Sequence, residues 1–284
     1  YTCAVRWSRR SGPVPSVTPA TSREIVHVAS EEITHLEIVK EQRLFEFQRL
    51  NASGLKPPTP GVAKTFSERG DRKEAEAQVF LTVLDVDTLG NCGRAVELAA
   101  GNSYLGILLK ARQPNLEVVT LEARERSAKA ARGYALAMDV NIDIRQADIY
   151  KTAIPGGAWL AKHACGPLID FIIETWRGRK DSPFLALMTC CHGFAMDQPR
   201  YGVPAEEWKE LCRQSDWTNH VDATKRILGQ QAMERLDRLR VEFLMAEGND
   251  GIRAQLLNGN NILDSYHIPH APILKGNVII ARKQ

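Results

Sequence analysis

The sequence has no hydrophobic run that approaches the ~20 residues of a membrane-spanning helix, so we expect neither a membrane protein nor a membrane partner. Net charge is small, +3 at pH 7, and therefore neither favours nor excludes a nucleic-acid partner. Cysteine is sparse, with six residues scattered over 284. A chain of this length does not depend on disulfides, so a reducing compartment is expected.

Acidic residues are missing from the first 23 positions, which carry four arginines and many Ser, Thr and Pro residues. A segment with so little apolar content cannot bury a core, so we predict an extended basic tail over 1–27. Three interpretations stay open: a disordered arm, the remnant of an organellar transit sequence, and an arm that lies on RNA. The transit interpretation predicts a mitochondrial location, and the others leave the cytoplasm or the nucleus.

A helical extension with a linker is predicted over 28–90. Apolar residues at helical spacing predict a helix over 28–50, and a second helix is expected over 72–89. Between them, the Pro and Gly content of 51–62 is typical of a linker. The remaining residues, 91–284, are predicted to form one domain.

Strand and helix alternate in this domain. Short hydrophobic runs predict strands at 94–98, 116–122, 141–148, within 158–166 and at 184–192, and a closing antiparallel pair at 252–257 and 277–282. Helical patterns lie between and after them, at 103–112, at 124–138, up to residue 176, at 204–214 and at 220–247. Such alternation implies right-handed crossovers and a mainly parallel sheet, so the predicted fold class is α/β.

The last of these helices has a clear apolar face. Its predicted core stripe consists of Leu228, Ala232, Leu236, Leu239 and Phe243. On another side, Glu234 and Arg238 stand four residues apart and are expected to pair.

Acidic residues follow three predicted strands. Glu97 ends the first, Glu122 the second and Asp148 the third. Because the carboxyl ends of parallel strands meet at one edge of a sheet, we expect all three around one ligand. A carboxylate after the second strand can accept both hydroxyls of a ribose, and an acceptor after the third can pair with the amine of adenine.

The turn after the first strand, in "VELAAGNSYLG", lacks a three-glycine loop. Gly101 is present, but Ala99 and Ser103 occupy two positions where glycine is usual. A dinucleotide pyrophosphate needs the close approach that a tight glycine loop allows. S-adenosyl-L-methionine carries no phosphate and tolerates a looser turn, so it is the expected cofactor. Its predicted binding residues are Glu97, Ala99, Gly101, Ser103, Glu122 and Asp148.

Two further motifs end the fourth and fifth strands: "KHACGPLID" at 162–170 and "TCCHG" at 189–193. They resemble the Lys-His-x-Cys-Gly-x-x-x-Asp and Cys-Cys-His motifs of the eukaryotic tRNA ribose-2′-O-methyltransferase family that modifies the acceptor stem, and of related methyltransferase-like proteins. The resemblance continues in 224–248, with its Leu-Gly and Asp-x-x-Arg pattern, and in 271–282. It implies a class I S-adenosylmethionine-dependent methyltransferase fold (a Rossmann-like sheet) with an N-terminal helical extension. It also implies RNA, either tRNA or rRNA, as the substrate.

The resemblance places Lys162, His163 and Asp170 near the substrate, and His192 along the cleft. A ribose 2′-hydroxyl is a poor nucleophile, so a base and a cation that stabilises developing negative charge would help. We therefore predict Lys162, His163 and His192 as catalytic residues. For His163 the alternative is a histidine that is merely hydrogen-bonded at a strand end.

Metal binding is not expected from the spacing of the Cys and His residues. Cys190, Cys191 and His192 are adjacent, and adjacent cysteines rarely bind one structural zinc together. The small Cys/His zinc modules of the acceptor-stem family are also missing. The weakened glycine loop and the long basic arm leave a competing function open: an assembly or structural factor on a ribonucleoprotein such as the mitochondrial ribosome, which has kept the fold and lost turnover.

Overall fold

The computed structural model describes residues 77, 80–81, 83–84, 86–246, 251–257 and 277–284. The predicted basic tail, the helix at 28–50 and the linker at 51–62 lie outside the described residues. Of the second predicted helix, Ala77, Phe80 and Leu81 are helical, and helix α3 (Val86–Asn91) follows. No helix in the described ranges has the length and apolar character needed to cross a bilayer.

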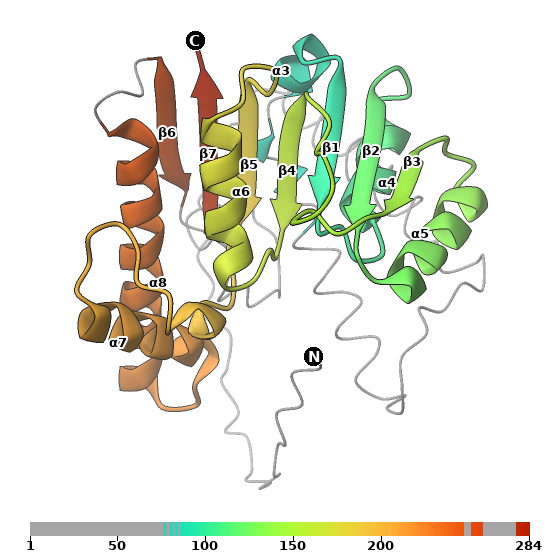
Figure 1. Cartoon of the computed structure of the whole chain (residues 1–284). Helices are drawn as coiled ribbons and strands as arrows, with labels where there is room; N and C mark the ends of the chain where they lie inside the picture. Colours follow the sequence, from blue (N-terminus) through green and yellow to red (C-terminus); the bar gives the residue numbers. More distant parts are fainter. Residues whose placement is uncertain (1–76, 78–79, 82, 85, 247–250, 258–276) are drawn as a thin grey trace, which may run out of the picture. The chain divides into compact units, whose positions relative to one another are not determined.

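Seven strands form one sheet in the order β3-β2-β1-β4-β5-β7-β6 (Figure 1). The parallel strands are β1 (Arg94–Leu98), β2 (Glu117–Glu122), β3 (Asp143–Gln146), β4 (Ala158–Lys162) and β5 (Phe184–Met188). The closing pair, β6 (Ile252–Leu257) and β7 (Val278–Lys283), is antiparallel, and β7 also runs antiparallel to β5. This topology confirms the predicted class I sheet.

The chain order reverses between β1 and β4, which are neighbours in the sheet. Open α/β sheets bind ligands beyond the carboxyl ends of their strands at such a reversal. The loops that follow β1 and β4 are therefore the first place to look for a site.

Two strands are shorter than the sequence predicts. β3 ends at Gln146 instead of residue 148, because it is an edge strand with β2 as its single partner. β5 ends at Met188, and residues 189–192 have left the strand. Asp148 and the Cys-Cys-His motif consequently lie in loops.

Helices cover both faces of the sheet because the strand residues alternate between them (Figure 1). On one face, α4 (Tyr104–Arg112) packs against residues such as Ala95 and Leu160. On the other, α6 (Pro167–Arg177) packs against residues such as Val96 and Trp159. The remaining helices are α5 (Glu125–Ala137), α7 (Ala205–Ser215) and α8 (Ala223–Met245).

Helix α8 departs from the predicted apolar stripe. Ala232, Leu236 and Leu239 are buried as expected, but Leu228 is 39% exposed. The helix also buries Asp237 and Arg240 completely, which the apolar period could not predict. The predicted pair between Glu234 and Arg238 is confirmed, at 2.6 Å.

A glycine in α8 allows close packing. A Cβ atom on Gly229 would lie 2.5 Å from the backbone nitrogen of Thr218, in the short 3-10 helix Asp216–Asn219. Only a residue without a side chain fits there, which accounts for the glycine of the Leu-Gly pattern.

Candidate functional site

The loop after β1 has a left-handed backbone at its three predicted cofactor-binding residues. The φ angles are 52° at Ala99, 58° at Gly101 and 54° at Ser103. This conformation costs a residue with a side chain roughly 1–2 kcal/mol, whereas glycine adopts it freely. The loop thus keeps the backbone of a glycine-rich turn although two glycines are replaced, and strain of this kind collects at functional sites.

Hydrogen bonds to β2 hold this loop in place. The Ala100 amide donates to the carbonyl of Leu121 at 3.0 Å. The Ser103 hydroxyl, fully buried, bonds the hydroxyl of Thr120 at 2.9 Å. The second bond offsets part of the cost of a left-handed serine.

Glu122 ends β2 and faces the same loop. Its Oε2 accepts the backbone N–H of Gly101 at 2.7 Å, and its Oε1 accepts both the backbone N–H and the Nε of Arg124 at 2.9 Å. A carboxylate has about four acceptor positions, so these bonds leave capacity on Oε2. The Arg124 side chain is 73% exposed and can be displaced by a ligand hydroxyl. A Cβ atom on Gly101 would meet no heavy atom within 4 Å, so there is open space beside this backbone.

Glu97, at the end of β1, is buried against α4. Its Oε2 accepts the backbone N–H of Gly106 at 2.9 Å. Gly106 makes the approach possible, because a Cβ atom there would lie 2.8 Å from that oxygen. Burial raises the pKa of Glu97 to about 8, against the opposing effects of the Gly106 hydrogen bond and the Lys162 charge. At neutral pH the Glu97 side chain is mainly a neutral acid, and its hydrogen bond to Gly106 holds the first turn of α4 against β1.

Asp148 lies two residues beyond β3 and is partly exposed. It accepts the backbone N–H of Tyr150 at 3.0 Å. Glu122 pairs in register with Gln146, and the Ala147 amide donates to the Glu122 carbonyl at 2.9 Å. Glu122 and Asp148 therefore stand at the same edge of the sheet, as predicted.

Lys162 and His163 stand at the carboxyl end of β4, beside β1. Lys162 is the last residue of the strand, in register with Met188, and His163 follows with a φ of 62°. The His163 amide donates to the carbonyl of Met188 at 2.9 Å. The left-handed turn directs the chain away from the sheet, toward Gly166 and α6. Gly166 is required there, because a Cβ atom on it would lie 2.6 Å from the Cβ of Phe194.

Behind this edge, four charged or titratable side chains form a buried ion cluster: Asp170, His192, Asp237 and Arg240. Each is 0% exposed. Arg240 donates Nε to Asp170 at 2.8 Å and Nη1 to Asp237 at 2.9 Å. The same Nη1 lies 3.1 Å from Nδ1 of His192. Burial of two carboxylates is tolerated here because one guanidinium lies between them.

Neutral groups complete the cluster. Asp237 accepts hydrogen bonds from Thr189 at 2.8 Å and from Asn277 at 3.1 Å, and Asp170 accepts one from Tyr201 at 2.7 Å. Burial still raises the pKa of Asp237, although the Arg240 charge and these hydrogen bonds act in the opposite direction.

All four motif segments of the sequence meet in this cluster. Asp170 comes from the first, His192 from the second, Asp237 and Arg240 from the Asp-x-x-Arg pattern, and Asn277 from the closing strand segment. The cluster joins α6, α8 and the loop after β5. Of the three predicted catalytic residues, the structure brings Lys162 and His163 to the sheet edge and buries His192 in the cluster. In the sequence, the feature that points to Asp237 and Arg240 as a pair is their spacing of three residues in the Asp-x-x-Arg pattern of one helix.

The thiols of Cys165, Cys190 and Cys191 also converge, with their sulfurs all within 4.8 Å of one another. They lie beyond β4 and β5, so the loops of these strands carry both the predicted catalytic residues and a group of soft metal-ligand atoms.

A hollow of about 470 Å³ lies at the opposite edge of the sheet, lined by residues such as Gly93, Glu117 and Asp181. It is found where β1, β2 and β4 begin. Ligands of open α/β sheets bind at the other edge, so this hollow is not the candidate site.

Comparison with known proteins finds similarity to a methyltransferase domain over part of the chain. Residues 73–195 match the family model described as "Methyltransferase domain". A curated relative from Xenopus laevis, named glutathione S-transferase C-terminal domain-containing protein, is 28% identical over 192 residues, covering 63% of this chain and 31% of that protein. The Homo sapiens protein of the same name is 27% identical over 191 residues, covering 63% of this chain and 30% of its own length. The chain thus spans about a third of the length of these relatives.

Solved methyltransferase structures share partial similarity with this chain. The plantazolicin methyltransferase BpumL, solved in complex with SAH and a triazolic desmethylPZN analog, has a TM-score of 0.47 and 9% identity, covering 90% of this chain and 100% of that one. An O-methyltransferase from Bacillus cereus, also in complex with SAH, has a TM-score of 0.42 and 17% identity, with coverage of 86% and 91%. The family model and the strand order together establish a class I methyltransferase fold.

Proposed function

We propose that this methyltransferase domain binds S-adenosylmethionine and transfers its methyl group to a ribose 2′-hydroxyl of RNA. The observation that carries the proposal is the loop after β1, with left-handed Ala99 and Ser103 on either side of Gly101. Strained backbone of this kind collects at ligand sites, which supports a bound ligand beside this loop.

The residues around this loop fit an adenosine-bearing cofactor. Glu122 retains acceptor capacity toward a ribose, and Asp148 offers a partly exposed carboxylate to the adenine amine. S-adenosylmethionine would supply an electrophilic methyl group at this edge. Glu97, neutral at pH 7, would hold α4 and the loop in place without presenting a charge to the ligand.

Two residues at the carboxyl end of β4 would act on the acceptor. His163 would take the proton of a hydroxyl, and Lys162 would stabilise the negative charge that develops on its oxygen. His192, buried against Arg240, would act as a positioning residue for the loop after β5.

RNA is supported as the substrate class by the acceptor-stem family resemblance and by exposed aromatic residues. Phe194 follows β5, is 60% exposed and lies beside Gly166. Tyr150 follows β3, is 52% exposed and packs against Phe171 in a tilted arrangement, with ring centroids 4.5 Å apart. Single-stranded RNA bases stack on such side chains, and stacking holds them where a ribose can be modified.

Calorimetric titration of the full chain with S-adenosylmethionine tests the cofactor. Glu122→Ala should weaken binding by ~1–3 kcal/mol, because a charged acceptor is lost. Glu117→Ala is the matched control: the residue begins the same strand at the opposite edge and pairs with Arg94, so affinity should not change. No binding by the wild type would overturn the proposal.

The acceptor is tested by incubating the full chain with cellular RNA and methyl-labelled S-adenosylmethionine, followed by nuclease digestion. Label in 2′-O-methylated nucleosides is the expected result. Label elsewhere, on a base or on protein, would contradict the ribose assignment.

A second candidate function rests on the same loop. If Ala99 and Ser103 mark lost turnover, the chain would be an assembly factor on a ribonucleoprotein. Cofactor binding without methylation of any cellular RNA would favour this role.

Mitochondrial location and RNA contacts of the N-terminal arginines are proposals as well. Deletion of residues 1–23 tests both, by following the location of the protein and its salt-sensitive sedimentation with ribonucleoprotein particles.

A further inference from the structure

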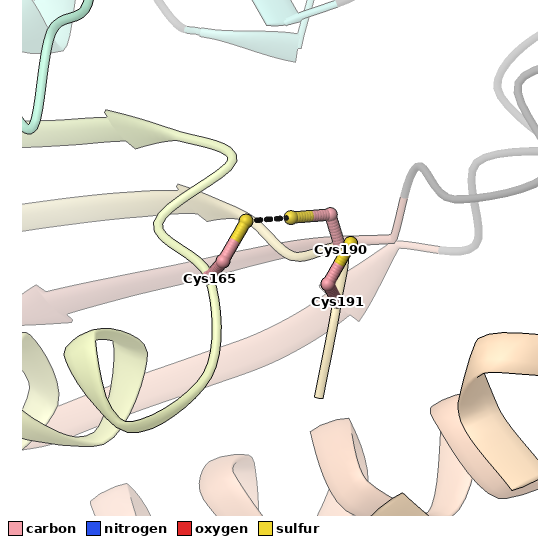
Figure 2. Close-up of side chains that lie close together, drawn as sticks. All are labelled: Cys165, Cys190 and Cys191. Atoms are coloured by element: carbon pink, nitrogen blue, oxygen red, sulfur yellow. Dashed lines mark hydrogen bonds between the residues drawn. The ribbon is translucent and has the colours of Figure 1, made fainter. Parts of the chain in front are cut away.

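Three cysteine thiols meet where β4 and β5 end (Figure 2). The Sγ atoms of Cys165 and Cys190 lie 2.8 Å apart and point toward one another. All three sulfurs, with that of Cys191, lie within 4.8 Å of one another. In a tetrahedral zinc site with Zn–S bonds of about 2.3 Å, sulfurs are about 3.8 Å apart, so rotations of the side chains suffice to reach that geometry.

The adjacency of Cys190 and Cys191 does not prevent joint coordination in this loop. Neighbouring residues of a strand point to opposite faces, but β5 has already ended at Met188. The backbone beyond it is irregular, and it places both sulfurs near Cys165. Cys165 comes from a different loop, 25 residues earlier, so the folded sheet and not the local spacing forms the group.

The surroundings favour a bound cation over three free thiolates. Cys190 is buried, and Cys165 and Cys191 are partly buried. Three thiolates held this close in a partly buried loop repel one another, so they are stable as a set only with a cation among them.

We propose that Cys165, Cys190 and Cys191 form a zinc site with an exchangeable fourth ligand. Three thiolates select a soft or borderline metal, and zinc with three protein ligands keeps one position open for water or another small ligand. Among the residues that the structure describes, no other Cys, His, Asp or Glu joins the group. Binding releases three thiol protons and leaves one net negative charge, in a loop that begins directly after the cationic Lys162.

Competition between zinc and alkylation tests the site in the full chain. The reduced protein is treated with N-ethylmaleimide with and without zinc, and mass spectrometry then maps each cysteine. Zinc should slow alkylation of Cys165, Cys190 and Cys191 at least 10-fold and leave Cys92 unchanged. Cys92 is half-buried like Cys165 but lies outside the group, so it serves as an internal control.

Cobalt substitution counts the ligands. Three thiolates should give a charge-transfer absorption with three Co–S contributions, and Cys191→Ser should remove about one third of it. Cys212→Ser is the control for loss of a buried thiol and should leave the band unchanged. A small added thiol should shift the d–d bands, because it enters the fourth position.

Three outcomes would overturn the proposal: a metal content near zero after zinc loading, a cobalt spectrum with fewer than three thiolates in the wild type, or a Cys165–Cys190 disulfide in the native protein at cytosolic redox potential. None of these readouts uses methyl transfer, so failure of the metal site and failure of the proposed function are distinguishable.

Discussion

The sheet edge beside β1, β2 and β4 and the buried ion cluster behind β5 use polar residues in opposite ways. At the edge, Asp148 and Lys162 are partly exposed, and Glu122 keeps spare acceptor capacity beside its hydrogen bonds to Gly101 and Arg124. In the cluster, Asp170 and Arg240 are fully buried, and they hydrogen-bond to one another and to near neighbours. The predicted site residues thus divide into a group suited to ligands and a group that holds the fold together.

Residues of one motif therefore need not share one role. Lys162 and Asp170 belong to the same nine-residue motif, yet one ends a strand at the candidate site and the other lies inside α6. The fold requires Asp170, Asp237 and Arg240 to be present together, because a lone buried charge is costly. Four predictions test this division, in order of expected effect.

The largest effect is expected inside the buried ion cluster. Arg240→Met should lower the free energy of unfolding by about 3–5 kcal/mol, because it leaves two buried carboxylates without their cation. Urea denaturation followed by circular dichroism measures the change. Arg238→Met on the same helix removes an exposed pair with Glu234 and should cost no more than about 0.5 kcal/mol. Equal losses in both variants would mean that the cluster contributes nothing special to stability.

At the sheet edge, substitution of His163 should change activity and leave stability unchanged. His163→Asn should reduce the rate of the proposed RNA methylation by roughly 10²–10⁴-fold, because the proposed general base is lost. Asparagine tolerates the left-handed backbone at this position, so the melting temperature should stay within error of the wild type. Parallel loss of activity and melting temperature would place His163 with the structural group.

Glu97 lies between the two regions, and its titration can be measured. Its pKa of about 8 in the folded protein, against the ordinary 4.5, means that the folded state holds one proton more than the unfolded state between these values. Stability is therefore fully present below the unfolded pKa and falls with rising pH by about 1.4 kcal/mol per pH unit until the folded pKa is reached.

Unfolding experiments at about pH 5.5 and pH 7.5 check this sign. The wild type should lose about 2.5 kcal/mol more than Glu97→Gln over this interval, since glutamine cannot titrate. Glu117→Gln, in the exposed pair with Arg94, should behave like the wild type. A wild-type profile parallel to that of Glu97→Gln would show that Glu97 titrates normally.

The smallest effect concerns the strain in the loop after β1. Ala99→Gly should raise stability by up to about 1 kcal/mol, because relief of the left-handed alanine exceeds the added entropy of the unfolded chain. Differential scanning calorimetry would detect the higher melting temperature. Ala100→Gly, one residue later and without a positive φ, should instead destabilise slightly. A drop for Ala99→Gly would mean that its methyl group packs favourably and the position is not strained.

Much of this molecule follows from its sequence alone. Short apolar runs and helical spacing determine the alternating elements and the closing antiparallel pair, because these periodicities reflect which face of an element is buried. The acids that end β1 and β2 and the Lys-His pair after β4 were predictable at one edge, because parallel strands bring their carboxyl ends together. The same argument placed Asp148 at that edge, although β3 ends two residues before it.

Tertiary structure alone decided three other features. The burial of His192, Asp237 and Arg240 depends on the packing of α8 against α6 and the loop after β5. From the sequence alone, charged residues in a helix are interpreted as a solvated face. The left-handed backbone of Ala99 and Ser103 runs against their intrinsic preference and is held by contacts with β2. The meeting of Cys165 with Cys190 and Cys191 joins two loops that are distant in the chain, and local spacing carries no information about such contacts because only strand pairing creates them.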